Sequence, residues 1–91
     1  VQRVRRTVAP PDGVRDDMDI LIALADRMGV VLGPRGAEAV WNELRSLSPM
    51  HAGMSYARLE SEKGLQWPCY DDQHPGEMYL HGRLWERPIR G

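Results

Sequence analysis

The chain has 91 residues, of which 42% are hydrophobic and 27% are charged, and its net charge at pH 7 is −1. A chain of this length forms one small domain with a limited core, and its ordinary composition excludes collagen-like and wholly disordered classes. The near-neutral charge favours neither nucleic acid nor a membrane surface as a partner, and the longest strongly apolar run, residues 20–25, is shorter than the roughly 18 residues of a membrane-spanning helix.

The first predicted helix runs from about Asp17 to Met28. Apolar residues recur there at helical spacing and form one face, namely Ile20, Leu21, Leu24, Ala25 and Met28. Either Asp16 or Asp17 is expected to accept hydrogen bonds from the free amides of the first turn. Gly29 is expected to end the helix in a left-handed conformation.

A second helix is predicted from about Ala37 to Leu47, and Pro49 ends it because proline cannot continue the hydrogen-bond ladder. One face carries the apolar residues Ala37, Val40, Trp41, Leu44 and Leu47. We expect the two helices to pack on each other through their apolar faces, with Trp41 in the core. The preceding run from Val30 to Leu32 is predicted to be either a brief strand or a buried connection.

The third predicted helix is short, with Ser55 as its cap, Tyr56 to about Ser61 as its body and Gly64 as its end. The predicted fold class is therefore mainly α: a small bundle of two amphipathic helices plus a short third. Residues 1–15 are expected to be a connector, residues 16–63 the helical part, and residues 64–91 an irregular, aromatic-rich docking tail. At most brief strands are expected, near residues 30–32 and 78–81.

Cysteine usage limits the chemistry available to the chain. Cys69 is the only cysteine, so the chain forms no internal disulfide and cannot supply the four protein ligands of an iron–sulfur cluster. This favours a cytoplasmic location. We expect Cys69 to be buried and structural rather than a nucleophile, because Asp71 and Asp72 follow it closely and acids raise the pKa of a thiol. His51, His74 and His81 lack the paired spacing of zinc ligands and are expected in loops or on the surface.

Other candidate constellations are equally weak. The paired acids Asp71 and Asp72, or Glu60 and Glu62, are expected to be solvated, and the spaced glycines between residues 29 and 36 lack the lysine of a phosphate loop. Charge is uneven along the chain: residues 1–15 carry four arginines and one aspartate, whereas residues 58–77 carry two basic and five acidic residues. Two solvated surfaces explain this better than a nucleic-acid footprint; a further option is that these segments pair with neighbours outside the sequence.

The order of the segments is more specific than any single motif. Residues 1–29 read VQRVRRTVAPPDGVRDDMDILIALADRMG, residues 39–69 read AVWNELRSLSPMHAGMSYARLESEKGLQWPC, and residues 71–85 read DDQHPGEMYLHGRLW. Together they resemble a stretch of the molybdopterin-dependent oxidoreductases, specifically formate dehydrogenase catalytic (alpha) subunits, with GLQWPC as the most specific motif. The resemblance covers roughly residues 1–85 and suggests an internal fragment of such a subunit.

The resemblance implies a parent enzyme that oxidises formate to carbon dioxide. Such enzymes use molybdenum or tungsten bound by two molybdopterin guanine dinucleotides, together with iron–sulfur clusters. Their metal-ligating cysteine or selenocysteine is followed by histidine, whereas Cys69 is followed by Tyr70, so Cys69 does not match it. The resemblance therefore implies a non-catalytic structural portion, packed on the cofactor-binding domains, that is not expected to be active alone.

No catalytic, cofactor-binding or metal-binding residue is assigned from the sequence. A cofactor contact from Arg3, Gln66 or Trp67 is weighed against the commoner case of buried aromatic and solvated basic side chains, which is preferred. The alternative function is a freestanding helical interaction module that binds a partner subunit or an assembly factor. In either case the isolated chain is expected to self-associate, because its helix faces leave apolar area uncovered.

Overall fold

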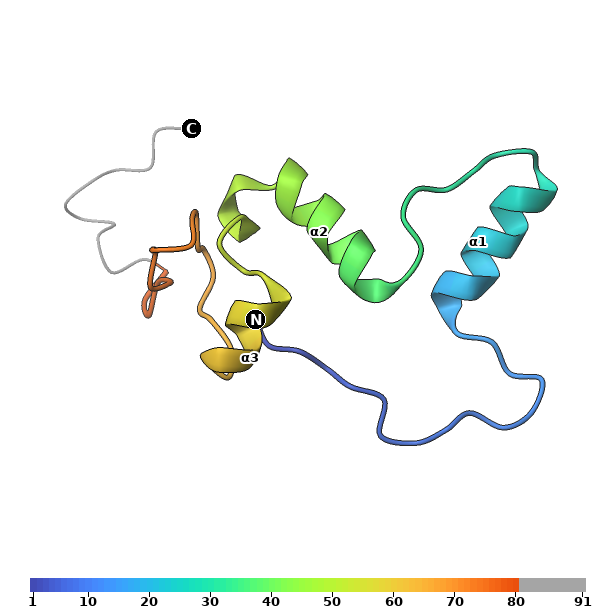
Figure 1. The fold of residues 1–91 in the computed structure, drawn as a ribbon, viewed down its shortest axis with the longest axis horizontal. Coiled ribbons are helices and arrows are strands. Elements are labelled where there is room, and N and C mark those ends of the chain that lie inside the picture. The colour runs from blue at the N-terminus through green and yellow to red at the C-terminus, as the bar shows by residue number, and fades with distance from the viewer. Residues whose placement is uncertain (81–91) are drawn as a thin grey trace.

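The computed structural model describes residues 1–80. In this part of the chain the helices are α1 (Asp17–Arg27), α2 (Ala37–Leu47), the short 3-10 helix η1 (Pro49–His51) and α3 (Tyr56–Ser61), and there is no strand. Figure 1 shows α1 standing apart from the rest, while α2, η1 and α3 gather near the start of the chain. The predicted mainly helical class is confirmed.

The helix ends follow from local chemistry. Of the two candidate caps of α1, Asp16 is the one used, because its side chain accepts a hydrogen bond from the Asp19 amide at 3.0 Å. Gly29 has a φ of 77° and lets the Val30 amide return to the Ala25 carbonyl at 2.9 Å. The predicted helices thus agree with the structure to within one residue at each of these ends.

The expected packing of the two long helices on each other is wrong. The predicted apolar face of α1 is largely exposed (Ile20 49%, Leu21 58%, Leu24 55%, Met28 72%); of that face only Ala25 is buried, together with Ile22, which lies outside it. Within residues 1–80, α2 and η1 are the pair of elements in extensive contact. The segment between the helices, which contains Pro34 and Gly36, directs α1 away from α2 (Figure 1). Helical spacing specifies an apolar face, but it does not specify what covers that face.

The run from Val30 to Leu32 is neither a strand nor buried, so both expectations for it are wrong. Its three side chains are 52%, 84% and 44% exposed in chain order. A short apolar run becomes a strand only when a second strand pairs with it, and residues 1–80 provide none. Residues 78–80 likewise form bends and a turn; residue 81 of the second expected strand, and Leu84-Trp85, lie outside the described residues.

The core of the described part lies between α3 and the segment that follows it. Met54, Leu59, Leu65 and Cys69 are buried together, and Trp41 and Trp67 pack against them. The Trp41 indole nitrogen donates to the Met54 carbonyl at 2.7 Å, so its polar atom is satisfied inside the core. The predicted core position of Trp41 is confirmed. No helix in residues 1–80 has the length and apolar character needed to cross a membrane.

Candidate functional site

Arg58 organises the densest polar cluster of the described residues. It sits in α3, where Ser55 caps the helix by accepting from the Arg58 amide at 3.2 Å. Its guanidinium donates to the carbonyls of Gly53 (3.1 Å), Asp71 (3.0 Å) and His74 (2.6 Å), and to the sulfur of Cys69 (3.3 Å). The planar fork of arginine suits such a set of acceptors. We call these five residues the Arg58 cluster; it fastens the loop 69–76 to the turn before α3.

Cys69 is fully enclosed by this cluster. Its side chain is 0% exposed, and its thiol donates to the His74 carbonyl at 3.2 Å while accepting from Arg58. The expected burial of Cys69 is confirmed. A nucleophilic cysteine needs an accessible thiolate, and a metal ligand needs a deprotonated sulfur that is free to face the metal. The Cys69 thiol is buried, donates to the His74 carbonyl and accepts from Arg58, so its environment does not fit a ligand of molybdenum or of an iron–sulfur cluster.

The backbone around the cluster approaches very closely at Gly53. Its amide donates to the Cys69 carbonyl at 3.0 Å, and the Cys69 amide donates to the Met50 carbonyl at 2.8 Å. A β-carbon added at Gly53 would lie 2.0 Å from the Asp71 carbonyl oxygen and 2.8 Å from the Cys69 sulfur. The loop and the turn therefore pack at a distance that only glycine permits.

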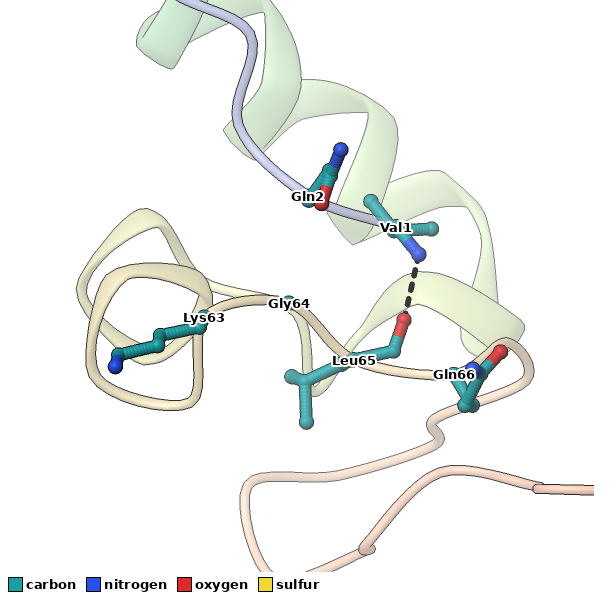
Figure 2. A pocket seen from close by; sticks show the side chains of 6 residues that line it. All are labelled: Val1, Gln2, Lys63, Gly64, Leu65 and Gln66. Atoms are coloured by element: carbon teal, nitrogen blue, oxygen red, sulfur yellow. Dashed lines mark hydrogen bonds between the residues drawn. The ribbon is translucent and has the colours of Figure 1, made fainter.

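The start of the chain closes one side of this core. Val1 and Leu65 exchange two hydrogen bonds, from the Val1 nitrogen to the Leu65 carbonyl at 2.6 Å and from the Leu65 amide to the Val1 carbonyl at 2.8 Å. Figure 2 shows the first of these, with the Leu65 side chain directed away from Val1. A hollow of about 300 Å³ lies at this junction, lined by Val1, Gln2, Lys63, Gly64, Leu65 and Gln66. Gln66 is exposed there and forms no side-chain hydrogen bond within residues 1–80.

The N-terminal arginines pair with acids of the same chain. The Arg3 guanidinium donates to Glu60 at 2.7 Å and lies 4.1 Å from the centre of the Tyr56 ring, and Arg5 also donates to Glu60. Arg6 contacts Asp16 at 3.4 Å. The two oppositely charged surfaces expected from the sequence are thus partly joined to each other. This pairing was missed, because charge counts along a sequence do not show which segments meet.

These ion pairs make the stability of the fold depend on pH. The pKa of Glu60 lies below its ordinary value of 4.5, chiefly because Arg5 hydrogen-bonds to the carboxylate, with the charges of Arg5 and Arg3 adding to the effect against opposing desolvation. Because the pKa of Glu60 is lower in the folded state, the ion pairs stabilise the fold fully when the pH is above the ordinary pKa. This stabilisation is lost as the pH falls through the lowered pKa.

We expect Glu60→Gln to lower the unfolding midpoint at neutral pH and to flatten its decline in acid, as measured by urea unfolding at a series of pH values. Glu62→Gln is the matched control, because Glu62 is exposed and forms no ion pair within residues 1–80. An acid decline equally steep in the parent chain and in Glu60→Gln would contradict the assignment.

The remaining sequence candidates lie in separate places. His51 lies between two tryptophans, with ring-centre distances of 5.7 Å to Trp41 and 6.2 Å to Trp67, and its Nδ1 is 2.7 Å from the Ser48 hydroxyl. His74 accepts from the Gly76 amide at 3.1 Å, and His81 lies outside the described residues. Residues 1–80 contain no group of three or more histidine, cysteine, aspartate or glutamate side chains placed to hold a metal.

A second hollow, of about 520 Å³, lies where the start of α1 faces α2. We call it the α1–α2 hollow. Its walls are mainly apolar side chains of α2, with Tyr56 of α3, and two acids at the start of α1 lie at its edge; the lining residues are Asp16, Asp17, Met18, Ala37, Val40, Trp41, Leu44 and Tyr56. Val40 and Leu44 are 40% and 41% exposed, so apolar surface remains uncovered here.

Comparison of the sequence with known proteins identifies relatives of this chain. The chain is 35% identical over 83 residues to the F420-dependent formate dehydrogenase subunit alpha of Methanocaldococcus jannaschii, and 38% identical over 90 residues to the F420-dependent formate dehydrogenase 2 subunit alpha of Methanococcus maripaludis. It is 40% identical over 87 residues to the periplasmic nitrate reductase of Desulfovibrio desulfuricans.

These three matches include 89%, 97% and 86% of this chain, but only 12%, 13% and 12% of the respective relatives. The chain therefore spans about one eighth of the length of the curated relatives it matches. No family model matches the chain. No solved structure matches it either.

Proposed function

Because this chain is a relative of one segment of the molybdopterin-dependent oxidoreductases, among them formate dehydrogenase alpha subunits, we propose that it forms a non-catalytic, structural portion of a formate dehydrogenase-like enzyme. The intact enzyme oxidises formate to carbon dioxide. In such an enzyme, molybdenum or tungsten bound by two molybdopterin guanine dinucleotides, together with iron–sulfur clusters, would supply the two-electron redox chemistry. Other segments of the polypeptide hold these groups.

The environment of Cys69 carries this proposal. Molybdenum and iron–sulfur centres require soft, deprotonated ligands, and Cys69 is the only residue of the chain with a thiol. That thiol is buried and hydrogen-bonded both to Arg58 and to the His74 carbonyl. Using it as a ligand would break the Arg58 cluster. Its role in the proposed enzyme is to hold the loop 69–76.

The exposed helix faces support a role in packing. Apolar side chains of α1 and α2 remain 40–78% exposed, namely Ile20, Leu21, Leu24, Val40, Leu44 and Leu47. Small soluble proteins rarely expose a contiguous apolar area of this kind unless something covers it. In the proposed enzyme residues 1–15 are a connector, residues 16–63 supply the helices, whose exposed faces pack on the cofactor-binding domains, and residues 64–91 are an irregular docking tail.

Replacing Cys69 tests the proposal. In the full-length subunit, we expect Cys69→Ala to reduce stability while metal content and formate-dependent dye reduction per folded molecule stay within about twofold of the parent enzyme. The parent subunit, purified in the same way, is the reference. In a separate experiment, fractionation of cells that contain the parent subunit tests the expected cytoplasmic location. A folded Cys69→Ala subunit that has lost its metal would show that Cys69 is a ligand and would overturn the proposal.

A freestanding helical module that binds a partner subunit or an assembly factor is the second candidate. The same exposed faces of α1 and α2 favour it, because an uncovered apolar face suits association. The genomic reading frame separates the two proposals. A frame that continues into cysteine-rich and pterin-binding segments supports the enzyme, whereas start and stop codons that bracket these residues support the module.

A further inference from the structure

We infer that the α1–α2 hollow is the docking site of another segment of the same polypeptide, one that presents a large apolar side chain with a lysine or arginine beside it. This inference rests on the proposed function and names the partner of one surface. The hollow is shared by parts of the chain that are otherwise far apart, since α1 stands away from the remaining helices (Figure 1). Whatever fills it fixes the position of α1.

The chemistry of the walls selects an apolar occupant. The Trp41 indole nitrogen already donates to Met54 at 2.7 Å, and Asp16 already accepts from the Asp19 amide at 3.0 Å. Small-molecule sites need a few polar groups that converge on the ligand. These two are engaged elsewhere, and among the lining side chains that leaves the Asp17 carboxylate and the Tyr56 hydroxyl without a hydrogen bond within residues 1–80. Val40 and Leu44 leave an apolar surface that gains most from burying an aliphatic or aromatic side chain.

The acidic edge of the hollow favours an occupant with a basic residue next to its apolar side chain. Asp17 lines the hollow and forms no ion pair with any residue of the described part, whereas Asp16 is contacted by Arg6 at 3.4 Å. A basic side chain next to the apolar anchor would pair with Asp17 and favour one orientation of docking.

The length of the relatives argues for an occupant from the same polypeptide. The matched segment makes up 12–13% of the formate dehydrogenase alpha subunits, so most of such a polypeptide lies elsewhere in the sequence. A segment tethered in the same chain binds at a high effective concentration and therefore outcompetes a second copy. A second copy fills the hollow only when the segment is isolated, consistent with the expected self-association of the 91 residues alone.

Site-specific photo-crosslinking in the full-length subunit tests this inference. A benzoylphenylalanine residue at position 40, replacing Val40, is expected to crosslink within its own polypeptide to a peptide that contains a large apolar residue next to lysine or arginine. The matched control places the same group at Ser46, which is exposed on another side of α2. We expect at least fivefold less intramolecular product from position 46.

Three outcomes would overturn the inference: equal yields from the two positions, a product that joins two copies or two different subunits, or an apolar peptide without a basic neighbour. As a second measurement, Asp17→Lys should reduce the yield from position 40 several-fold, whereas Asp19→Lys should not. The crosslinking experiment tests the docking site alone, whereas the metal content and formate oxidation of Cys69→Ala test the proposed function. The two proposals can therefore fail independently of each other.

Discussion

Gly53→Ala is expected to unfold the core around Met54 and Cys69. The new β-carbon would lie 2.0 Å from the carbonyl oxygen of Asp71 and 2.6 Å from its carbonyl carbon, so the backbone of the loop has to move. Overpacking a well-fitted core costs typically 1–3 kcal/mol even when side chains absorb the strain. Because backbone atoms are the obstacle here, we expect a loss of about 3 kcal/mol or more in the free energy of unfolding.

The measurement is urea unfolding followed by tryptophan fluorescence, because Trp41 and Trp67 both pack against this core. Gly33→Ala is the matched control. Its added β-carbon would meet only the flexible carboxylate of Glu43, at 3.2 Å, and that side chain can move into solvent. We expect its free energy of unfolding to change by less than about 0.5 kcal/mol. Similar midpoints for the two variants would show that the loop does not contact Gly53 as described.

The features that the sequence predicts well are those set by near neighbours in the chain. The ends of α1, α2 and α3 and the caps at Asp16 and Ser55 agree with the structure, because a cap depends on residues only three or four positions apart. The burial of Cys69 and the core position of Trp41 also follow from residue type and local pattern.

The features that the sequence does not predict depend on distant segments. Nothing in the sequence around Arg58 indicates its role. The groups at Asp71 and His74 to which it donates are backbone carbonyls, which every residue possesses. The pairing of Arg3 and Arg5 with Glu60 joins residues more than fifty positions apart. The failure of α1 to pack on α2 has the same cause, since periodicity defines a face without its partner.

Arg58→Met is expected to release the loop 69–76 from α3. The methionine side chain approximates the length of the arginine stem but donates no hydrogen bond, so three carbonyls and the Cys69 sulfur lose a charged donor. A hydrogen bond to a charged group contributes about 1.5–3 kcal/mol, and neighbouring bonds of one cluster are not additive. We therefore expect a loss of about 2–4 kcal/mol in the free energy of unfolding.

The reactivity of Cys69 with a thiol reagent reports on this release directly. Its side chain is 0% exposed in the intact cluster, so the reagent reaches it only when the loop opens. We expect Arg58→Met to raise the modification rate at least tenfold, which corresponds to about 1.4 kcal/mol in the opening equilibrium. Arg58→Lys should restore little, because an ammonium group cannot reproduce the fork that reaches both Asp71 and His74.

Arg35→Met is the control for the loss of an arginine as such. Arg35 pairs with Asp26 at 3.0 Å, but both side chains are well exposed, at 62% and 44%. Exposed pairs contribute at most about 1 kcal/mol, and Arg35 does not contact the loop, so its replacement should leave the modification rate of Cys69 unchanged. If Arg58→Met protected Cys69 as well as the parent chain does, the loop would have to be held by other contacts, and Arg58 would be an incidental neighbour. The rate difference between these two arginine variants therefore separates a specific fastening of the loop from a general effect of lost positive charge.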